Sequence, residues 1–309
     1  VTIVHEDGSL TVKGPAAEPL VVDVDGTSAL SLVARGVDSD IRIEGKVTSD
    51  SGQVSLRAER DVRFMSLGSI ETESGNVRIT ADAASAGMLG EFAMEDGAKI
   101  VTERGQVTVS ADGDVTLASV ESGARDEAAV TITSRSGAIL DGGDADRDVI
   151  ANQGGVVMTS LLGIGNNNAL ETSVAIAIAR VTGTGSIAFD DADEIELREI
   201  ITADGSITIV AMGTMTATQV TSLNSGGIDD LPGAGASHRD IRLTTVGRES
   251  DIRVRSLVAR NGADVMLEGG VDVIYTYRAA EVRFKADDLR GLARNGTGDG
   301  TMAIQLATA

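Results

Sequence analysis

Apolar and polar residues alternate in short runs along this chain, and residues 105–120 give the clearest example. Val107 and Val109 alternate with polar neighbours, a four-residue turn follows, and the alternation resumes at Val115 and Leu117. Alternation with a period of two, interrupted by glycine and aspartate, is typical of short half-buried strands joined by sharp corners.

The spacing between such strands recurs. In five places an apolar residue is followed eight positions later by another, at Val54/Val62, Val107/Val115, Ile187/Ile195, Ile207/Met215 and Val265/Val273. A third apolar residue comes five positions after four of these pairs, at Leu67, Val120, Ile200 and Val220, and Ile252/Leu257 repeats this second interval. The pattern predicts a coil of three short strands that turns twice and returns above its start.

The first strands of successive coils repeat along the whole chain. Their apolar pairs are Leu10/Val12, Leu30/Leu32, Val54/Leu56, Val77/Ile79, Val107/Val109, Val130/Ile132, Val156/Met158, Ile187/Phe189, Ile207/Ile209, Ile241/Leu243, Val265/Leu267 and, more weakly, Val282/Phe284 and Ile304/Leu306. A repeat of about 24 residues is typical of stacked architectures. We therefore predict an all-β parallel β-helix (a β-solenoid) with about 12–13 coils of 20–30 residues, as a single segment over residues 1–309.

Three longer intervals predict insertions near residues 83–98, 163–172 and 223–239, the first of them with room for a short helical turn. Loops on one face of a solenoid often form its binding face, although flexible spacers are as common. Residues 286–294 break the strand pattern and predict either a helical turn or a distorted coil.

Composition supports narrow coils with small aliphatic cores. Aromatic residues make up 2% of the chain and tryptophan is absent, which disfavours a string of immunoglobulin-like sandwiches. The 37 glycines supply corners, and the absence of cysteine excludes disulfides and thiolate metal sites.

Charge excludes one class of partner. The net charge of −21 argues against a nucleic-acid surface, and no apolar run is long enough for a membrane span. The last quarter is nearly neutral and carries arginines at Arg239, Arg242, Arg253, Arg255, Arg260, Arg278 and Arg283. Arg242, Arg253 and Arg255 occupy outward positions, and we expect stacked coils to align some of the arginines with Asp240, Glu249 and Asp251 in surface ion pairs.

The sharpest local signal is an acidic loop that contains Asp141, Asp144, Asp146 and Asp148. Carboxylates near every second position of a glycine-containing loop suit Ca²⁺, which binds six to eight oxygens. The EF-hand pattern is not met, so an acidic solvated corner is the alternative to a calcium site. No other cofactor is expected.

Candidate catalytic residues are sparse. His5 and His238 are the two histidines and lie far apart in the order of coils, so no Ser-His-Asp triad is expected. Parallel β-helices do include enzymes that cleave polysaccharides with paired carboxylates. The acids here lie mostly at corners, and Tyr275 and Tyr277 are the one exposed-looking aromatic pair.

Residues 137–176 carry more than periodicity. Gly-Ala-Ile-Leu-Asp-Gly-Gly at 137–143 is followed by Gly-Ile-Gly at 163–165 and by Asn-Ala-Leu-Glu-Thr at 168–172. This segment resembles the filamentous-haemagglutinin-like giant exoproteins and adhesins of Gram-negative bacteria, although Gly143 replaces asparagine and Ala169 replaces proline. The resemblance implies a right-handed parallel β-helix, export, and a place at the cell surface or outside the cell, and it brings no catalytic residues.

We therefore expect a structural shaft or fibre segment of a large secreted or cell-surface adhesin-type protein, without catalysis. The alternative is a carbohydrate-active β-helix enzyme of the polysaccharide lyase or hydrolase type. Residues 1–4 and 305–309 lack a capping pattern, so we expect further coils of the same protein or neighbouring copies as end-to-end partners. Cell-surface glycans or proteins are further candidate ligands.

Overall fold

The structure of the chain is a computed structural model. It describes residues 1–14, 20–82, 90–143, 146–166, 168–223, 241–247, 249–259, 265–269, 273–277, 289–295, 298–299 and 302–306.

These residues form strands that pair in parallel between one coil and the next, with one antiparallel pair near the end of the chain. The fold is thus the predicted all-β parallel β-helix. No helix in the described ranges is long and apolar enough to cross a membrane. The chain divides into two compact units, Val1–Ser160 and Leu161–Ala309.

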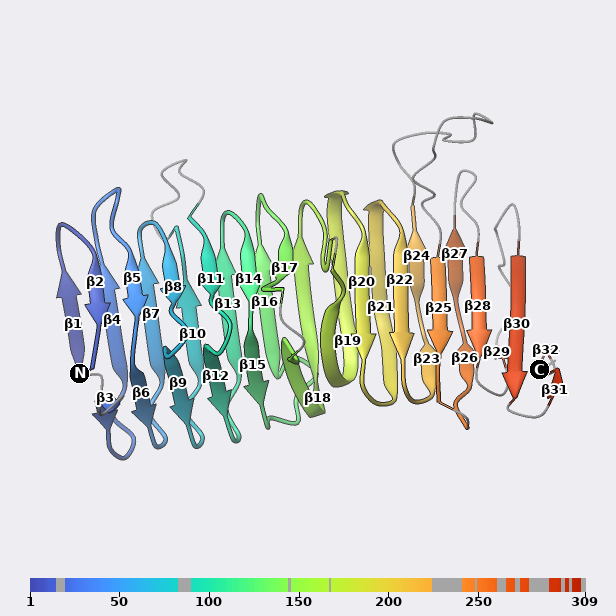
Figure 1. The fold of residues 1–309 in the computed structure, drawn as a ribbon, viewed down its shortest axis with the longest axis horizontal. Coiled ribbons are helices and arrows are strands. Elements are labelled where there is room, and N and C mark those ends of the chain that lie inside the picture. The colour runs from blue at the N-terminus through green and yellow to red at the C-terminus, as the bar shows by residue number, and fades with distance from the viewer. Residues whose placement is uncertain are drawn as a thin grey trace. The chain divides into compact units, whose positions relative to one another are not determined.

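In Val1–Ser160 the strands form three stacks, and each coil adds one strand to each stack (Figure 1). The first stack consists of β1 (Thr2–His5), β4 (Leu30–Ala34), β7 (Val54–Ala58), β10 (Val77–Thr80), β13 (Val107–Ala111) and β16 (Val130–Ser134). Residues 156–159 of β18 (Val149–Ser160) pair with β16 and continue this stack.

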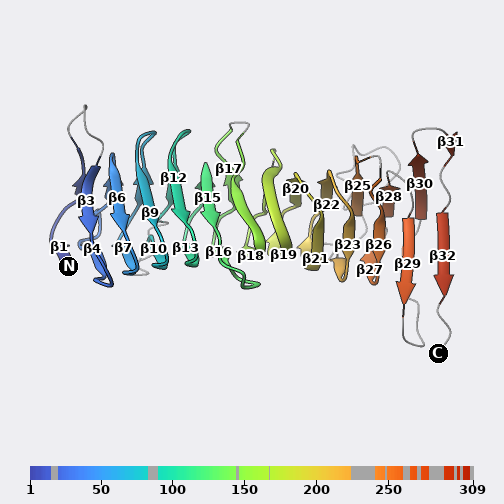
Figure 2. The same cartoon turned by 90° about the horizontal axis from the view of Figure 1, so that it is seen from below.

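The second stack contains strands of three residues, and the third contains slightly longer ones. The second stack consists of β2 (Leu10–Val12), β5 (Ile41–Ile43), β8 (Val62–Phe64), β11 (Phe92–Met94), β14 (Val115–Leu117) and β17 (Ile139–Asp141). The third consists of β3 (Leu20–Val24), β6 (Lys46–Ser49), β9 (Ser69–Thr72), β12 (Lys99–Thr102), β15 (Ser119–Ser122) and the start of β18, and Figure 2 shows it side by side with the first.

The second unit repeats this arrangement with two long strands. β19 (Leu170–Thr184) and β21 (Ile195–Asp204) pass through a corner without leaving the strand conformation, and they pair with a register shift at Ala177/Ile178. The first stack continues with β20 (Ile187–Asp191), β22 (Ile207–Ala211), β25 (Ile241–Thr245), β28 (Val265–Gly269) and β30 (Leu289–Asn295). The second stack contains β23 (Met215–Ala217), β26 (Ile252–Val254), β29 (Val273–Tyr277) and β32 (Met302–Leu306). The third stack contains β24 (Val220–Ser222) and β27 (Leu257–Ala259).

The core lies between the stacks and consists of aliphatic columns. In the first stack of Val1–Ser160, Leu56, Ile79 and Val109 occupy the same register and are all buried. The second stack adds Phe64 and Phe92, whose ring centroids lie 5.8 Å apart. Because buried and half-buried positions alternate along strands such as β4, β13 and β16, one slip in register there would turn a whole column outward.

Many corners after the third strand are closed by a serine or threonine followed three residues later by glycine. The Thr72 hydroxyl donates to the carbonyl of Gly75 at 2.6 Å, and the Thr102 hydroxyl accepts from the amide of Gly105 at 2.8 Å. A Cβ on Gly75 would lie 2.0 Å from the carbonyl oxygen of Gly52, and a Cβ on Gly105 would lie 2.3 Å from that of Gly75. Glycine is required because successive corners pass too close together for a side chain.

The eight-residue spacing between first and second strands is confirmed, since Val54 begins β7 and Val62 begins β8. The five-residue spacing that follows is wrong at one position. Leu67 is 71% exposed in the turn after β8, and Ile70 fills the core position in β9. The second corner varies in length between coils, so a fixed spacing fails there.

Two assignments to the first strand are also wrong. The pair Leu10/Val12 lies in β2, and the pair Ile304/Leu306 lies in β32, so both belong to the second stack. The reason is that alternation looks the same in every strand of a coil, and only pairing with a neighbouring coil distinguishes the stacks.

The predicted insertions are only partly described. Residues 83–89, where a helical turn was suggested, lie outside the described residues, whereas 92–94 form β11. The end of the segment 163–172 enters β19 at Leu170, and residues 224–239 again lie outside the description.

The segment 286–294, predicted as a helical turn or a distorted coil, contains β30 from Leu289 onward. β30 pairs in parallel with β28 and then in antiparallel fashion with β31 (Gly298–Asp299), so this coil departs from the regular path without a helix in its described part. The pair Val282/Phe284 lies outside the described residues.

We predict that Val109→Asp lowers the free energy of unfolding by more than ~3 kcal/mol, because an unpaired carboxylate would lie in a dry core. Val109 is fully buried, whereas its neighbour Thr108 is half-buried on the outer face of the same strand. Thr108→Asp is therefore the matched control and should cost less than ~1 kcal/mol. Urea unfolding followed by circular dichroism measures both, and equal losses would contradict the register.

Candidate functional site

The acidic loop predicted to bind calcium links β17 to β18. Asp141 ends β17 and is half-buried, Asp146 is exposed, and Asp148 is fully buried just before β18. Asp144 lies outside the described residues. The loop turns back at its start because Asp141 Oδ1 accepts a hydrogen bond from the amide of Gly143 at 2.8 Å, and Gly143 has a φ of +91° that favours glycine.

Two of the four predicted ligands converge. A carboxylate oxygen of Asp141 and one of Asp148 lie within 4.8 Å of each other. Ca²⁺ takes six to eight oxygens at about 2.3–2.6 Å, so this pair would supply part of a coordination shell, with loop carbonyls or water as the remainder. Calcium binding stays a prediction for this loop.

If the loop binds calcium, removing the ion with a chelator should lower the melting temperature by several degrees, because a ligand bound to the folded state stabilises it. Asp148→Asn should remove this chelator effect, since it takes away the buried carboxylate. The control is Asp126→Asn, which changes an exposed acid in the preceding coil. Differential scanning calorimetry with and without added calcium measures the shift. Identical melting curves in calcium and in chelator would leave the solvated-corner interpretation.

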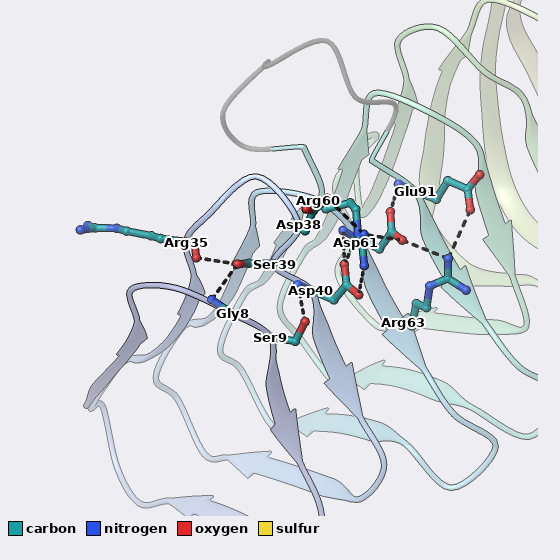
Figure 3. A network of polar contacts seen from close by, with 10 residues as sticks. All are labelled: Gly8, Ser9, Arg35, Asp38, Ser39, Asp40, Arg60, Asp61, Arg63 and Glu91. Atoms are coloured by element: carbon teal, nitrogen blue, oxygen red, sulfur yellow. Dashed lines mark hydrogen bonds and ion pairs between the residues drawn. The ribbon is translucent and has the colours of Figure 1, made fainter.

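A ladder of polar side chains runs along the corner before the second stack in Val1–Ser160 (Figure 3). Its members each stand immediately before a strand of that stack and are Ser9, Asp40, Asp61 and Glu91, which we call the corner ladder. Ser9 Oγ accepts a hydrogen bond from the amide of Asp40 at 3.1 Å, and Asp40 Oδ1 accepts from the amide of Asp61 at 3.2 Å. Asp61 Oδ1 accepts from the amide of Glu91 at 2.9 Å. The side chains of Ser9, Asp40 and Asp61 therefore each tie their own coil to the next one.

Two arginines neutralise the acids of the corner ladder (Figure 3). Arg60 donates from Nε and Nη2 to the two carboxylate oxygens of Asp40, both at 2.7 Å, which is the strong bidentate geometry. Arg63 donates to Asp61 Oδ2 at 3.0 Å and lies 3.7 Å from the carboxylate of Glu91. The ion pairs thus join the coils that contain β5, β8 and β11.

The electrostatics of this cluster favour permanently charged groups. Burial acts to raise the pKa of Asp40, but hydrogen bonds from Arg60 and from the amide of Asp61 outweigh it and hold that pKa below its usual range. The hydrogen bond to Asp40 in turn raises the pKa of Arg60. Neither group exchanges a proton near neutral pH, so the cluster acts as a brace between coils.

A second ionic brace crosses three coils of the third stack. Glu71 on β9 pairs with Lys46 on β6 through one oxygen and with Lys99 on β12 through the other, the latter at 2.9 Å. Burial acts to raise the pKa of Glu71, but the two lysines outweigh it and lower that pKa. A carboxylate shared by two cations in this way stabilises the stacking of both neighbouring coils.

The arginines of the last quarter lie where the sequence placed them, as far as they are described. Arg242, Arg253 and Arg255 are exposed on β25, on β26 and just after β26. Arg253 pairs with Asp251 at 3.3 Å, but the two residues lie in the same coil and not in stacked coils. Arg242 on β25 lies 4.0 Å from Glu268 on the neighbouring β28. Arg239, Arg260, Arg278 and Arg283 lie outside the described residues.

Neither Asp40 nor Asp191 has the properties of the accessible acid that sugar hydrolysis needs. A glycosidase places a carboxylic acid of raised pKa opposite a second carboxylate in an accessible site. Burial raises the pKa of Asp191 to about 6, but this side chain is fully buried, whereas the pKa of Asp40 is held low by Arg60. His5 is exposed, and His238 lies outside the described residues.

The sequence contains a signal for the corner ladder that periodicity alone does not reveal. An oxygen-bearing side chain directly precedes the first apolar residue of the second strand in five successive coils, from Ser9 to Asp114. The side chain of Asp114 repeats the contact, since its Oδ1 accepts from the amide of Ala138 at 2.8 Å. Each of these corner acids, taken singly, looks like a solvated surface group.

Comparison of the chain with protein-family models, with curated proteins and with solved structures gives no match.

We predict that Asp61→Ala lowers the free energy of unfolding by about 2 kcal/mol, because it removes the carboxylate oxygens that accept hydrogen bonds from the amide of Glu91 and from Arg63. Asp61 is 7% exposed. The control, Asp38→Ala, removes a 72%-exposed carboxylate 3.5 Å from Arg60 and should cost less than ~0.5 kcal/mol. Urea unfolding provides both values. Equal losses in the two variants would show that the ladder contributes no more than a surface ion pair.

Proposed function

We propose that this chain is a structural shaft or fibre segment of a large secreted or cell-surface adhesin-type protein. The observation that carries the proposal is the continuous register of parallel strands from coil to coil within each unit. The strands of each stack are hydrogen-bonded through their backbones to the strands of the neighbouring coils. Such a β-helix resists bending and the detachment of single coils. The work of the segment is therefore mechanical.

The contacts between coils support this role in three independent ways. The aliphatic columns are buried over many coils, the corner ladder joins side chains to the next backbone, and the Arg60 and Glu71 braces add charged contacts. Each type of contact runs from one coil to its neighbour. Load applied to one coil is thereby distributed over several.

A location at the bacterial surface or outside the cell is part of the proposal. It depends on the resemblance of residues 137–176 to filamentous-haemagglutinin-like exoproteins and on the absence of cysteine. The net charge of −21 would keep such a segment soluble outside the cell. An exported fibre without disulfides must obtain its stability from stacking, and the described contacts supply it.

The proposed partners are further coils of the same kind, arranged end to end, from the same longer protein or from neighbouring copies. Ile3 on β1 is in register with the buried Leu32, yet it is 44% exposed. A further parallel coil on β1 would bury Ile3 and extend the first stack. Cell-surface glycans or proteins would then bind along the length of the shaft.

Pulling single molecules from both ends tests the mechanical role. We expect the coils to detach in steps, each releasing about 24 residues or roughly 80 Å of chain, because each coil is held mainly by its neighbours. An α-helical domain in the same tether provides the reference force. Unfolding of the whole chain in one event below the reference force would contradict the proposal.

The enzyme alternative is tested on the same preparation. Incubation with a panel of acidic and neutral polysaccharides should release neither reducing ends nor unsaturated products. If the wild type releases such products and a variant with one acid replaced by its amide releases none, the chain is a carbohydrate-active enzyme. That result would overturn the structural proposal.

A further inference from the structure

A buried acid stands at the end of a core strand in the second unit. Asp191 is the last residue of β20 and aligns with Thr172 on β19 and with Ala211 on β22. The residues in register with it face the interior, and Asp191 itself is fully buried. A carboxyl group at such a position either carries a proton or brings a charge into the core.

The carboxyl group of Asp191 connects two successive corners. Its Oδ2 accepts hydrogen bonds from the hydroxyl of Thr172 at 2.8 Å and from the amide of Val174 at 3.2 Å. Its Oδ1 accepts from the amide of Asp193 at 3.0 Å, and the hydroxyl of Ser173 donates to Asp193 Oδ2 at 2.6 Å. Three of these hydrogen bonds connect residues 172–174 with residues 191–193, and the fourth lies within the corner 191–193.

The charged surroundings of Asp191 are acidic. Its own corner contributes the exposed Asp193 and Glu194, and the strand positions that alternate with the buried ones carry Glu171 on β19 and Asp190 on β20. On the other side, β22 places the uncharged Ala211 in register with it, followed by Met212 and Gly213. Among these neighbours Asp193 is the charge that acts on Asp191.

Burial and, to a smaller extent, the neighbouring Asp193 carboxylate together raise the pKa of Asp191 to about 6, even though the hydrogen bonds from Thr172 and from the two amides act to lower it. The folded state therefore holds a proton at pH values where the unfolded chain, with a pKa near 3.8, has lost it. The stability contributed by this proton is present below pH 3.8 and is lost as the pH rises to about 6.

We propose that Asp191 and Asp193 form a proton-controlled latch between the corner of β19 and the corner after β20, closed when Asp191 is protonated and loosened when it is ionised. The neutral acid fits the interior, whereas the ionised one places a second negative charge beside Asp193. The latch is local, since it holds one pair of corners and leaves the rest of the stack unchanged. It does not depend on the proposed shaft function.

Hydrogen exchange of the full chain between pH 4 and pH 8 tests the latch, after correction for the intrinsic pH dependence of exchange. We expect the open population at residues 172–174 and 191–193 to rise about a hundredfold across the range, since a pKa change of about two units corresponds to that factor. Exchange in β13 of the first unit should stay constant. Constant protection at both corners would overturn the proposal.

Three variants separate the latch from general acid or base effects. Asp191→Asn should abolish the pH dependence at both corners, whereas Asp190→Asn, an exposed neighbour on the same strand, should retain it. Asp193→Asn keeps Asp191 and removes the adjacent charge, so the midpoint of the transition should move to lower pH. This last variant decides the question if Asp191→Asn fails to fold. An unshifted midpoint, or a pH dependence that survives in Asp191→Asn, would rule the latch out.

Discussion

The rest of the structure depends on one constraint, which is that every coil must rise by the spacing of two hydrogen-bonded strands, about 4.8 Å. Strands meet this requirement easily, but corners do not, because their backbones cross at the same close separation. The glycines at 52, 75 and 105 are the consequence, since a Cβ at Gly75 or Gly105 would enter the carbonyl below it. The core columns are aligned because the corners fix the height of each coil.

Polar groups are arranged by the same constraint. Backbone amides at a corner lack a strand partner, and the corner ladder supplies acceptors for them from the preceding coil. Arginines and lysines then balance the acids that this role requires, as Arg60 does for Asp40 and as Lys46 and Lys99 do for Glu71. The chain carries a net charge of −21, yet Asp40, Asp61 and Glu71 each have a basic partner. Charge at these positions is therefore part of the stacking and not only of solubility.

The sequence predicted the fold class well and the contacts between coils poorly. The eight-residue spacing from Val54 to Val62 was correct because the first corner has a fixed form in those coils. Leu67 was misplaced because the second corner varies in length, and only pairing with neighbouring coils fixes its register. The proximity of Asp141 and Asp148 could be predicted from the sequence, since one short loop joins them. The contact between Arg60 and Asp40 could not, because it depends on the length of a whole coil.

The corner ladder also gives the fold a direction. In every contact from Ser9 to Glu91 the side-chain acceptor belongs to the earlier coil and the amide donor to the later one. Two such stacks joined by a two-fold axis would bring identical surfaces together, acceptors against acceptors or amides against amides. If coils are instead added in the same direction, each new junction repeats the contact between a side-chain acceptor and the next backbone amide. No new sequence feature is then needed. A gene that duplicates one coil would therefore lengthen the protein without inventing an interface.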